Sequence, residues 1–99
     1  MEHHVYFWLK DEFKNDEHRA IFKKGLDSLF SIDLVKGGKW STPAPVMERP
    51  VIDQSWDYAI SMTFDTVADH DTYQDVPVHS TFINNFKDTW AKVEVKDLA

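Results

Sequence analysis

Two side chains that can exchange protons, Tyr73 and His79, flank Pro77 in the sequence. His79 shares an apolar stripe at helical spacing with Phe82 and Ile83, so its imidazole is expected to face the interior near the start of a helix. An imidazole titrates near neutral pH and a nearby phenol can donate a hydrogen bond, a combination suited to proton removal beside a carbonyl group. The competing interpretation is structural: a core histidine with satisfied nitrogens and a half-buried tyrosine. Both interpretations stay open.

The other histidines are weaker candidates. His3 opens an alternating strand on the predicted inner face, where it could complete a polar cluster in an apolar pocket, or fray with the terminus. His4 points to the opposite face of the strand and cannot share an ion with His3. His18 and His70 are predicted to be solvent-facing helix residues. Because no inward histidine has a partner at metal-ligand spacing, we expect no metal site and no cofactor.

Several function classes are excluded by composition and motif. The chain has no cysteine, which excludes disulfides, thiolate zinc sites and a cysteine nucleophile. Gly37 and Gly38 lack the spacing of a phosphate loop, and no serine elbow is present. The net charge is -6, from 17 acids and 11 scattered bases, so we expect no nucleic-acid partner. The absence of a signal-like start and of an apolar run near 20 residues predicts a cytoplasmic protein without a membrane span.

The 99 residues suffice for one domain, residues 1–99, whose core must come from four Trp, seven Phe and three Tyr. Asn15 and Thr66 are predicted N-caps of two helices, and Pro77 separates the second helix from a third. Trp56 is assigned to the same strand face as Tyr58. The expected strands cover 3–10, 33–40 (before an irregular loop), 55–65 and 91–97. The expected helices are one over 16–31, a short one ending at Tyr73, and a third after Pro77. The third helix has one inward-facing stripe, formed by His79, Phe82, Ile83, Phe86 and Trp90.

This order, β-α-β-β-α-β, predicts an α+β, ferredoxin-like fold with an antiparallel sheet covered by helices on one face. The uncovered face would carry His4, Tyr6 and Trp8. Exposed aromatic patches mark interaction surfaces, so we expect a homodimer through the sheet faces, forming a dimeric α+β barrel. Small side chains at Ala59 and Ser61 would leave room for the aromatic rings.

The chain resembles the Dabb family of stress-responsive α/β-barrel domains over nearly its whole length, in the segments HHVYFWLK (3–10), YAISMTFD (58–65), YQDVPVHSTF (73–82) and WAKV (90–93). The resemblance implies a ferredoxin-like chain and a dimeric barrel. Some members close a polyketide ring without a cofactor, using a Tyr and a His as acid/base pair at the positions of Tyr73 and His79. His3 matches the family's histidine at the start of the first strand. Val76 stands where those members have a second histidine, so the match to that activity is incomplete.

Three functional hypotheses follow. The first is binding of a small apolar or aromatic molecule in a pocket between helices and sheet. The second is a cofactor-free cyclase, lyase or monooxygenase-like enzyme using Tyr73 and His79 as an acid/base pair. The third is an interaction module with a filled core and no cavity beside His79. The residues expected to line the pocket are His3, Val5, Phe7, Phe22, Ile60, Ile83 and Trp90.

Overall fold

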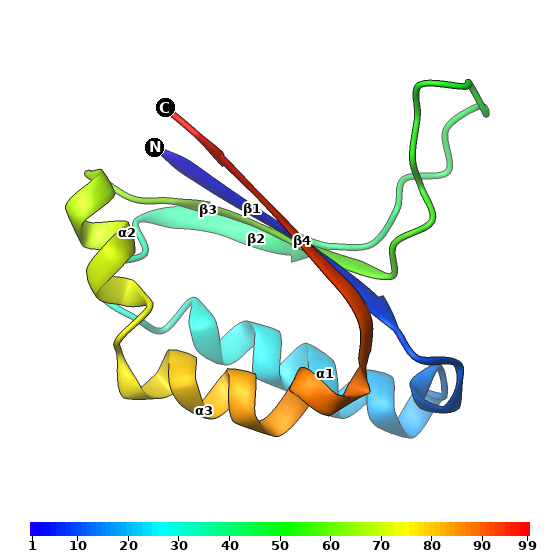
Figure 1. Cartoon of the computed structure of the whole chain (residues 1–99), viewed down its shortest axis with the longest axis horizontal. Helices are drawn as coiled ribbons and strands as arrows, with labels where there is room; N and C mark the ends of the chain where they lie inside the picture. The colour runs from blue at the N-terminus through cyan, green and yellow to red at the C-terminus, as the bar shows by residue number, and fades with distance from the viewer.

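The computed structural model describes residues 1–99 as one antiparallel sheet with helices on a single face (Figure 1). The strands lie in the order β2-β3-β1-β4, so β1 and β3 are central and β2 and β4 are the edges. This is the ferredoxin-like arrangement, and the predicted fold class is confirmed. The elements are β1 (Glu2–Leu9), the 3₁₀ turn η1 (Asp11–Phe13), α1 (Asp16–Leu29), β2 (Gly37–Ser41), β3 (Tyr58–Thr63), α2 (Val67–Tyr73), α3 (Pro77–Phe86), the 3₁₀ turn η2 (Lys87–Thr89) and β4 (Trp90–Leu98).

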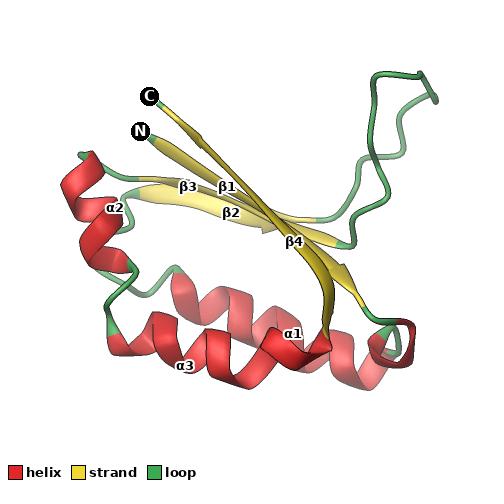
Figure 2. Ribbon diagram, in the orientation of Figure 1, coloured by secondary structure: helices red, strands yellow, loops and turns green.

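The helices begin where the capping residues predict. The side chain of Asn15 accepts a hydrogen bond from the backbone N–H of His18 at 2.8 Å, and Thr66 accepts one from Asp69 at 3.1 Å. Pro77 occupies the first turn of α3, where its missing N–H costs no hydrogen bond. In the folded chain, α1 and α3 run beneath the sheet, while α2 lies across one end of it (Figure 2).

The alternation of β1 separates the two faces of the sheet. Val5 and Phe7 are buried toward the helices, whereas Tyr6 and Trp8 lie on the uncovered face. Val5 pairs with Val95 and Phe7 with Val93, so these β4 side chains also face the helices. The predicted assignment of the β1 faces is confirmed.

Phe22 of α1 is the centre of the core and has no exposed surface. Its ring lies 5.4 Å from Phe7 on the sheet, 5.3 Å from Tyr58 on β3 and 5.1 Å from Phe86 on α3, measured between ring centroids. These edge-to-face contacts join both long helices to the sheet.

Two tryptophans differ from the prediction. Trp90 does not continue the α3 stripe, because the helix ends at Phe86 and η2 intervenes before β4; its ring still packs 5.0 Å from Phe7. Trp56 precedes β3 and lies on the uncovered face, with its ring 5.5 Å from Tyr6. In both cases a turn interrupts the periodicity from which the side-chain direction was inferred.

Residues 42–57 form a long connection without regular structure, which rises from the sheet on the side away from the helices (Figure 1). β2 begins at Gly37, later than the predicted strand, after the turns that follow α1. Met47 and Val51, at 86% and 91% exposure, lie on this connection. None of the helices combines the length and apolar character needed to cross a membrane.

Gly38 sets the close approach of β2 to β3. Its φ is +120°, and a Cβ added there would lie 1.8 Å from the carbonyl oxygen of Ser61. We expect Gly38→Ala to reduce the free energy of unfolding by roughly 2–4 kcal/mol, through backbone strain and steric overlap. Urea denaturation followed by tryptophan fluorescence measures the effect.

Gly37 is the matched control, because a Cβ there would meet nothing within 4 Å. Gly37→Ala should change the free energy of unfolding by no more than about 0.5 kcal/mol. Equal effects of the two substitutions would contradict this explanation of Gly38.

Candidate functional site

A cavity of about 210 Å³ lies between the inner face of the sheet and the α2–α3 corner. The hypothesis of a filled core is therefore wrong. Every residue predicted for the site borders this cavity except Phe22, which is fully buried among other aromatic rings. The lining is His3, Val5, Phe7, Leu29, Ile60, Tyr73, Gln74, His79, Phe82, Ile83, Trp90, Val93 and Val95.

Five lining residues were not predicted. Val93 and Val95 carried a usable signal, because they alternate with polar residues in the last strand and must share one face. Leu29 and Phe82 lie on the apolar stripes of their helices. Gln74 follows α2 and had no periodic signal at all.

Tyr73 and His79 meet at the corner between α2 and α3. Tyr73 is the last residue of α2 and His79 lies in the first turn of α3; their ring centroids are 4.8 Å apart. The backbone N–H of Val76 donates to the carbonyl of Tyr73, and that of His79 donates to the carbonyl of Val76. These turn hydrogen bonds hold the two rings side by side at the cavity.

Burial places both groups in their neutral forms. Burial raises the pKa of the Tyr73 phenol far above its usual value, so the hydroxyl keeps its proton. Burial also lowers the pKa of His79 below 6.5, although the backbone carbonyl of Gln74 partly opposes this effect. At neutral pH the pair therefore offers a hydroxyl donor and an imidazole that can accept a proton.

His3 supplies the third polar group on the cavity wall. Its ring lies 6.1 Å from that of Tyr73, between centroids, and its Nδ1 is 2.5 Å from Oδ1 of Asp97. Burial lowers the pKa of His3, while the hydrogen bond and charge of Asp97 raise it in part. The predicted inner-face position of His3 is confirmed, and the residue does not fray.

His70 is buried, with 7% exposure, so its predicted solvent-facing position is wrong. Its Nε2 lies 3.2 Å from Nδ1 of His3 because α2 packs across the end of the sheet. A signal existed: His70 precedes Tyr73 by three residues and therefore shares its helix face.

His18 is half-buried, and its predicted solvent-facing position is also wrong. The η1 turn places Phe13 5.0 Å from the His18 ring, while Phe22 stacks on it at 6.2 Å, between centroids. Burial lowers the pKa of His18, and its Nε2 is buried without a hydrogen-bond partner.

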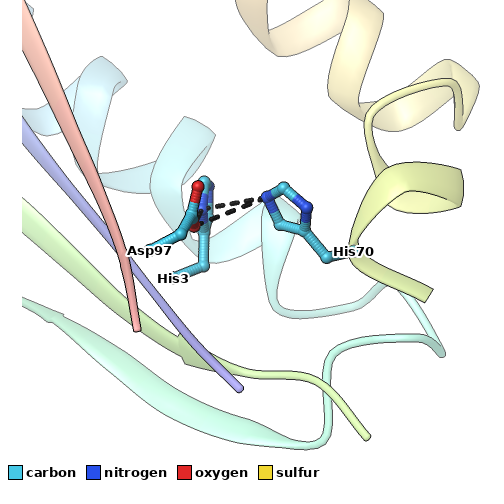
Figure 3. Close-up of side chains that lie close together, drawn as sticks. All are labelled: His3, His70 and Asp97. Atoms are coloured by element: carbon cyan, nitrogen blue, oxygen red, sulfur yellow. Dashed lines mark hydrogen bonds and ion pairs between the residues drawn. The ribbon is translucent and has the colours of Figure 1, made fainter. Parts of the chain in front are cut away.

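His3, His70 and Asp97 form the one group of side chains in the structure that could hold a metal ion (Figure 3). The sequence predicted no metal site, because residues 3, 70 and 97 are far apart along the chain and show no ligand spacing. Asp97 was not among the predicted site residues.

The family model described as Dabb, the stress responsive A/B barrel domain, matches residues 1–99. No functionally curated protein matches the chain in sequence.

Solved structures share the fold at low identity. The Arabidopsis thaliana protein At3g17210 is 22% identical, with a TM-score of 0.81, and the match covers 99% of this chain and 92% of that one. A hydroxynitrile lyase from Passiflora edulis is also 22% identical, with a TM-score of 0.79 over 96% of this chain and 87% of that one. A dimeric ferredoxin-like protein of unknown function from Thermobifida fusca is 17% identical, with a TM-score of 0.78 over 99% of this chain and 88% of that one. At these identities the likeness shows the fold alone.

Proposed function

This chain belongs to the Dabb family of stress-responsive α/β-barrel domains, and we propose that it binds a small apolar or aromatic molecule in the cavity beside Tyr73 and His79. The observation that carries the proposal is the character of that cavity. Ten of its thirteen lining residues are hydrophobic, and the polar groups of His3, Tyr73 and His79 converge on it. Apolar walls with a few polar groups are typical of small-molecule sites.

The volume suits a ligand of about one or two fused aromatic rings. An engineered apolar cavity of about 150 Å³ admits benzene, and the cavity here is about 210 Å³. Apolar walls supply affinity by removing the ring from water, and the Tyr73 hydroxyl can donate a hydrogen bond to an oxygen of the ligand. The preferred ligand is therefore aromatic with an oxygen substituent.

Filling the cavity from its edge tests binding. Val93 lines the cavity and is 38% exposed, so Val93→Phe places a ring in the cavity without removing core contacts. We expect Val93→Phe to weaken binding of 1-naphthol and of substituted phenols at least about tenfold. Isothermal titration calorimetry measures the affinity.

Val78 provides the matched control, since it is also 38% exposed but lies on α3 outside the cavity. Val78→Phe should bind the probes like the wild type. Equal affinity in Val93→Phe and wild type, or no binding of any probe to the wild type, would refute the cavity as the ligand site.

A second candidate function, proton-transfer catalysis without a cofactor, is favoured by the Tyr73 and His79 pair. The neutral imidazole of His79 can remove a proton from a bound substrate. The Tyr73 hydroxyl can donate a hydrogen bond to the oxygen on which negative charge develops. A cyclase, a lyase or a monooxygenase-like reaction could use this step, and the fold shared with a hydroxynitrile lyase supports the lyase class.

Two reactions report this chemistry: cleavage of benzaldehyde cyanohydrin, and exchange of the methyl protons of acetophenone in D₂O. We expect His79→Gln to lower kcat about 10²–10⁴-fold with probe affinity retained. Tyr73→Phe should lower kcat about 10²–10³-fold and also weaken probe binding, because the ligand oxygen loses its hydrogen-bond donor. Because only neutral His79 accepts a proton and burial lowers its pKa below 6.5, wild-type activity should persist at pH 6.5 and fall on further acidification.

His18→Gln is the control, since His18 is also partly buried with a lowered pKa but lies outside the cavity. It should leave both rates unchanged. A wild type without turnover of either substrate, or an equal loss in His18→Gln, would leave binding as the better description.

The chain also forms a homodimer through the uncovered sheet face in this proposal. Tyr6, Trp8 and Trp56 gather there around an open hollow of about 160 Å³, bordered by Glu94 and Lys96. Aromatic rings in a partly polar setting are typical of protein interfaces. The dimeric state of the Thermobifida fusca neighbour supports this arrangement. Residues 42–57, which project from the same face, support it too, because they expose Val46, Met47, Val51 and Ile52.

Substituting an aromatic residue of this face tests the dimer. Trp8→Asp should raise the dimer dissociation constant at least about tenfold, because tryptophans are frequent interface hot spots. Ile21→Asp is the control, since Ile21 is an exposed apolar residue of α1, on the helix side. Sedimentation equilibrium measures both, and a monomeric wild type at micromolar concentration would disprove the dimer.

A further inference from the structure

Three potential metal ligands converge at the end of the sheet beside the cavity. His3 comes from β1, Asp97 from the neighbouring edge strand β4 and His70 from α2, whose ring approaches from the helix side (Figure 3). His3 Nδ1 lies 2.5 Å from Asp97 Oδ1, His70 Nε2 lies 3.2 Å from His3 Nδ1, and His70 Nε2 lies 3.6 Å from Asp97 Oδ1. Three potential ligand atoms thus lie within 4.8 Å of one another.

The spacing is close to that of a tetrahedral site. Ligand atoms about 2.0–2.2 Å from a tetrahedral zinc ion are roughly 3.3–3.5 Å from one another. The two distances that involve His70 lie near this range, and the His3 to Asp97 contact must widen. In the tautomer that carries hydrogen on Nδ1, His3 donates to Asp97, and a bound cation would replace that proton.

The surroundings orient the ligands. Asp71 Oδ1 lies 3.1 Å from Nδ1 of His70, where it can accept the ring N–H and direct the Nε2 lone pair at the cluster. Phe64 packs edge-on against both imidazoles, with ring centroids 6.1 Å from His3 and 5.5 Å from His70. Because these contacts already fix the two imidazole rings, the rings lose little conformational freedom when they bind an ion.

The local charge also favours a cation. Asp71 and Asp97 flank the two imidazoles, and neither carboxylate pairs with a lysine or arginine. The side chain of Asp97 is 41% exposed, so an ion can reach the cluster from solvent. The amide of Gln74 lies 3.2 Å from Nε2 of His70 and must give way, which its exposed position allows.

We propose that His3, His70 and Asp97 bind a divalent transition-metal ion, with zinc as the best match. Two imidazoles and one carboxylate suit zinc and its first-row neighbours, whereas magnesium and calcium prefer oxygen ligands. Three protein ligands leave a coordination position for water, as in zinc sites that activate a bound molecule. This site goes beyond the proposed cavity function, since the cavity needs no metal to admit an aromatic ring.

The test uses the full chain without an affinity tag, stripped with a chelator that is then removed. Titration with Zn²⁺ in a calorimeter should show one ion bound per chain, and zinc should raise the thermal midpoint. Co²⁺ should give the intense visible absorption of a four-coordinate ion. A wild type that takes up neither ion would overturn the site and leave a hydrogen-bonded cluster, without affecting the cavity measurements with 1-naphthol.

Variants assign the ligands. His70→Gln and Asp97→Asn should each weaken zinc binding at least about 100-fold and abolish the cobalt spectrum. His4→Gln is the matched control, because His4 lies on the same strand but on the opposite face, and it should bind like the wild type. Circular dichroism verifies that each variant is folded. If His70→Gln fails to fold, Asp97→Asn still tests the site, because Asp97 is a partly exposed residue of an edge strand. Equal affinity in all three variants would overturn the assignment.

Discussion

The packing of Phe22 between the sheet and α3 is the contact on which the rest of the structure depends. Its ring touches Phe7 from the sheet and Phe86 from α3, and no part of it reaches solvent. Aromatic rings at this end of the core set the separation of the two layers. Toward α2 the facing side chains are the shorter Val5, Val95 and Ile60, which leave part of that separation unfilled. The cavity therefore lies between these aliphatic side chains and aromatic walls that include Phe7, Phe82 and Trp90.

The break between α2 and α3 gives this apolar cavity its polar groups. Pro77 cannot continue a preceding helix, so the chain turns at Val76 and begins a second helix in a new direction. A continuous helix would place Tyr73 and His79 on different turns and different faces. The turn instead puts the rings 4.8 Å apart on the cavity wall, where burial keeps both neutral. The same neutral pair serves recognition of an oxygen-bearing ligand and transfer of a proton.

His3 connects this cavity with the His70 and Asp97 cluster. The imidazole of His3 borders the cavity and contacts Asp97 through Nδ1. A movement of this ring therefore alters both the cavity wall and the cluster. The end of the sheet nearest α2 therefore brings His3, His70 and Asp97 together beside the cavity. The uncovered sheet face is separate from both, because β-strand alternation sends Tyr6 and Trp8 away from His3 and Phe7.

The sequence by itself determined the two faces of β1, the helix caps and the approximate site. Alternation placed His3, Val5 and Phe7 on the inner face, and capping chemistry set where helices begin at Asn15 and Thr66. These are local properties, which depend on neighbours within a few residues. The ferredoxin-like order follows from them, because few topologies accommodate that series of elements.

Tertiary structure alone decided what each element packs against. His70 and His18 looked solvent-facing because helical periodicity describes a helix face but not the element that covers it. The 3.2 Å contact between His70 and His3 joins residues 67 positions apart, and that between His3 and Asp97 joins residues 94 positions apart. Turns at η2 and before β3 redirected Trp90 and Trp56, and Phe22 entered the core instead of the cavity wall. Such positions depend on how the layers meet, which is a property of the whole chain and not of any local pattern.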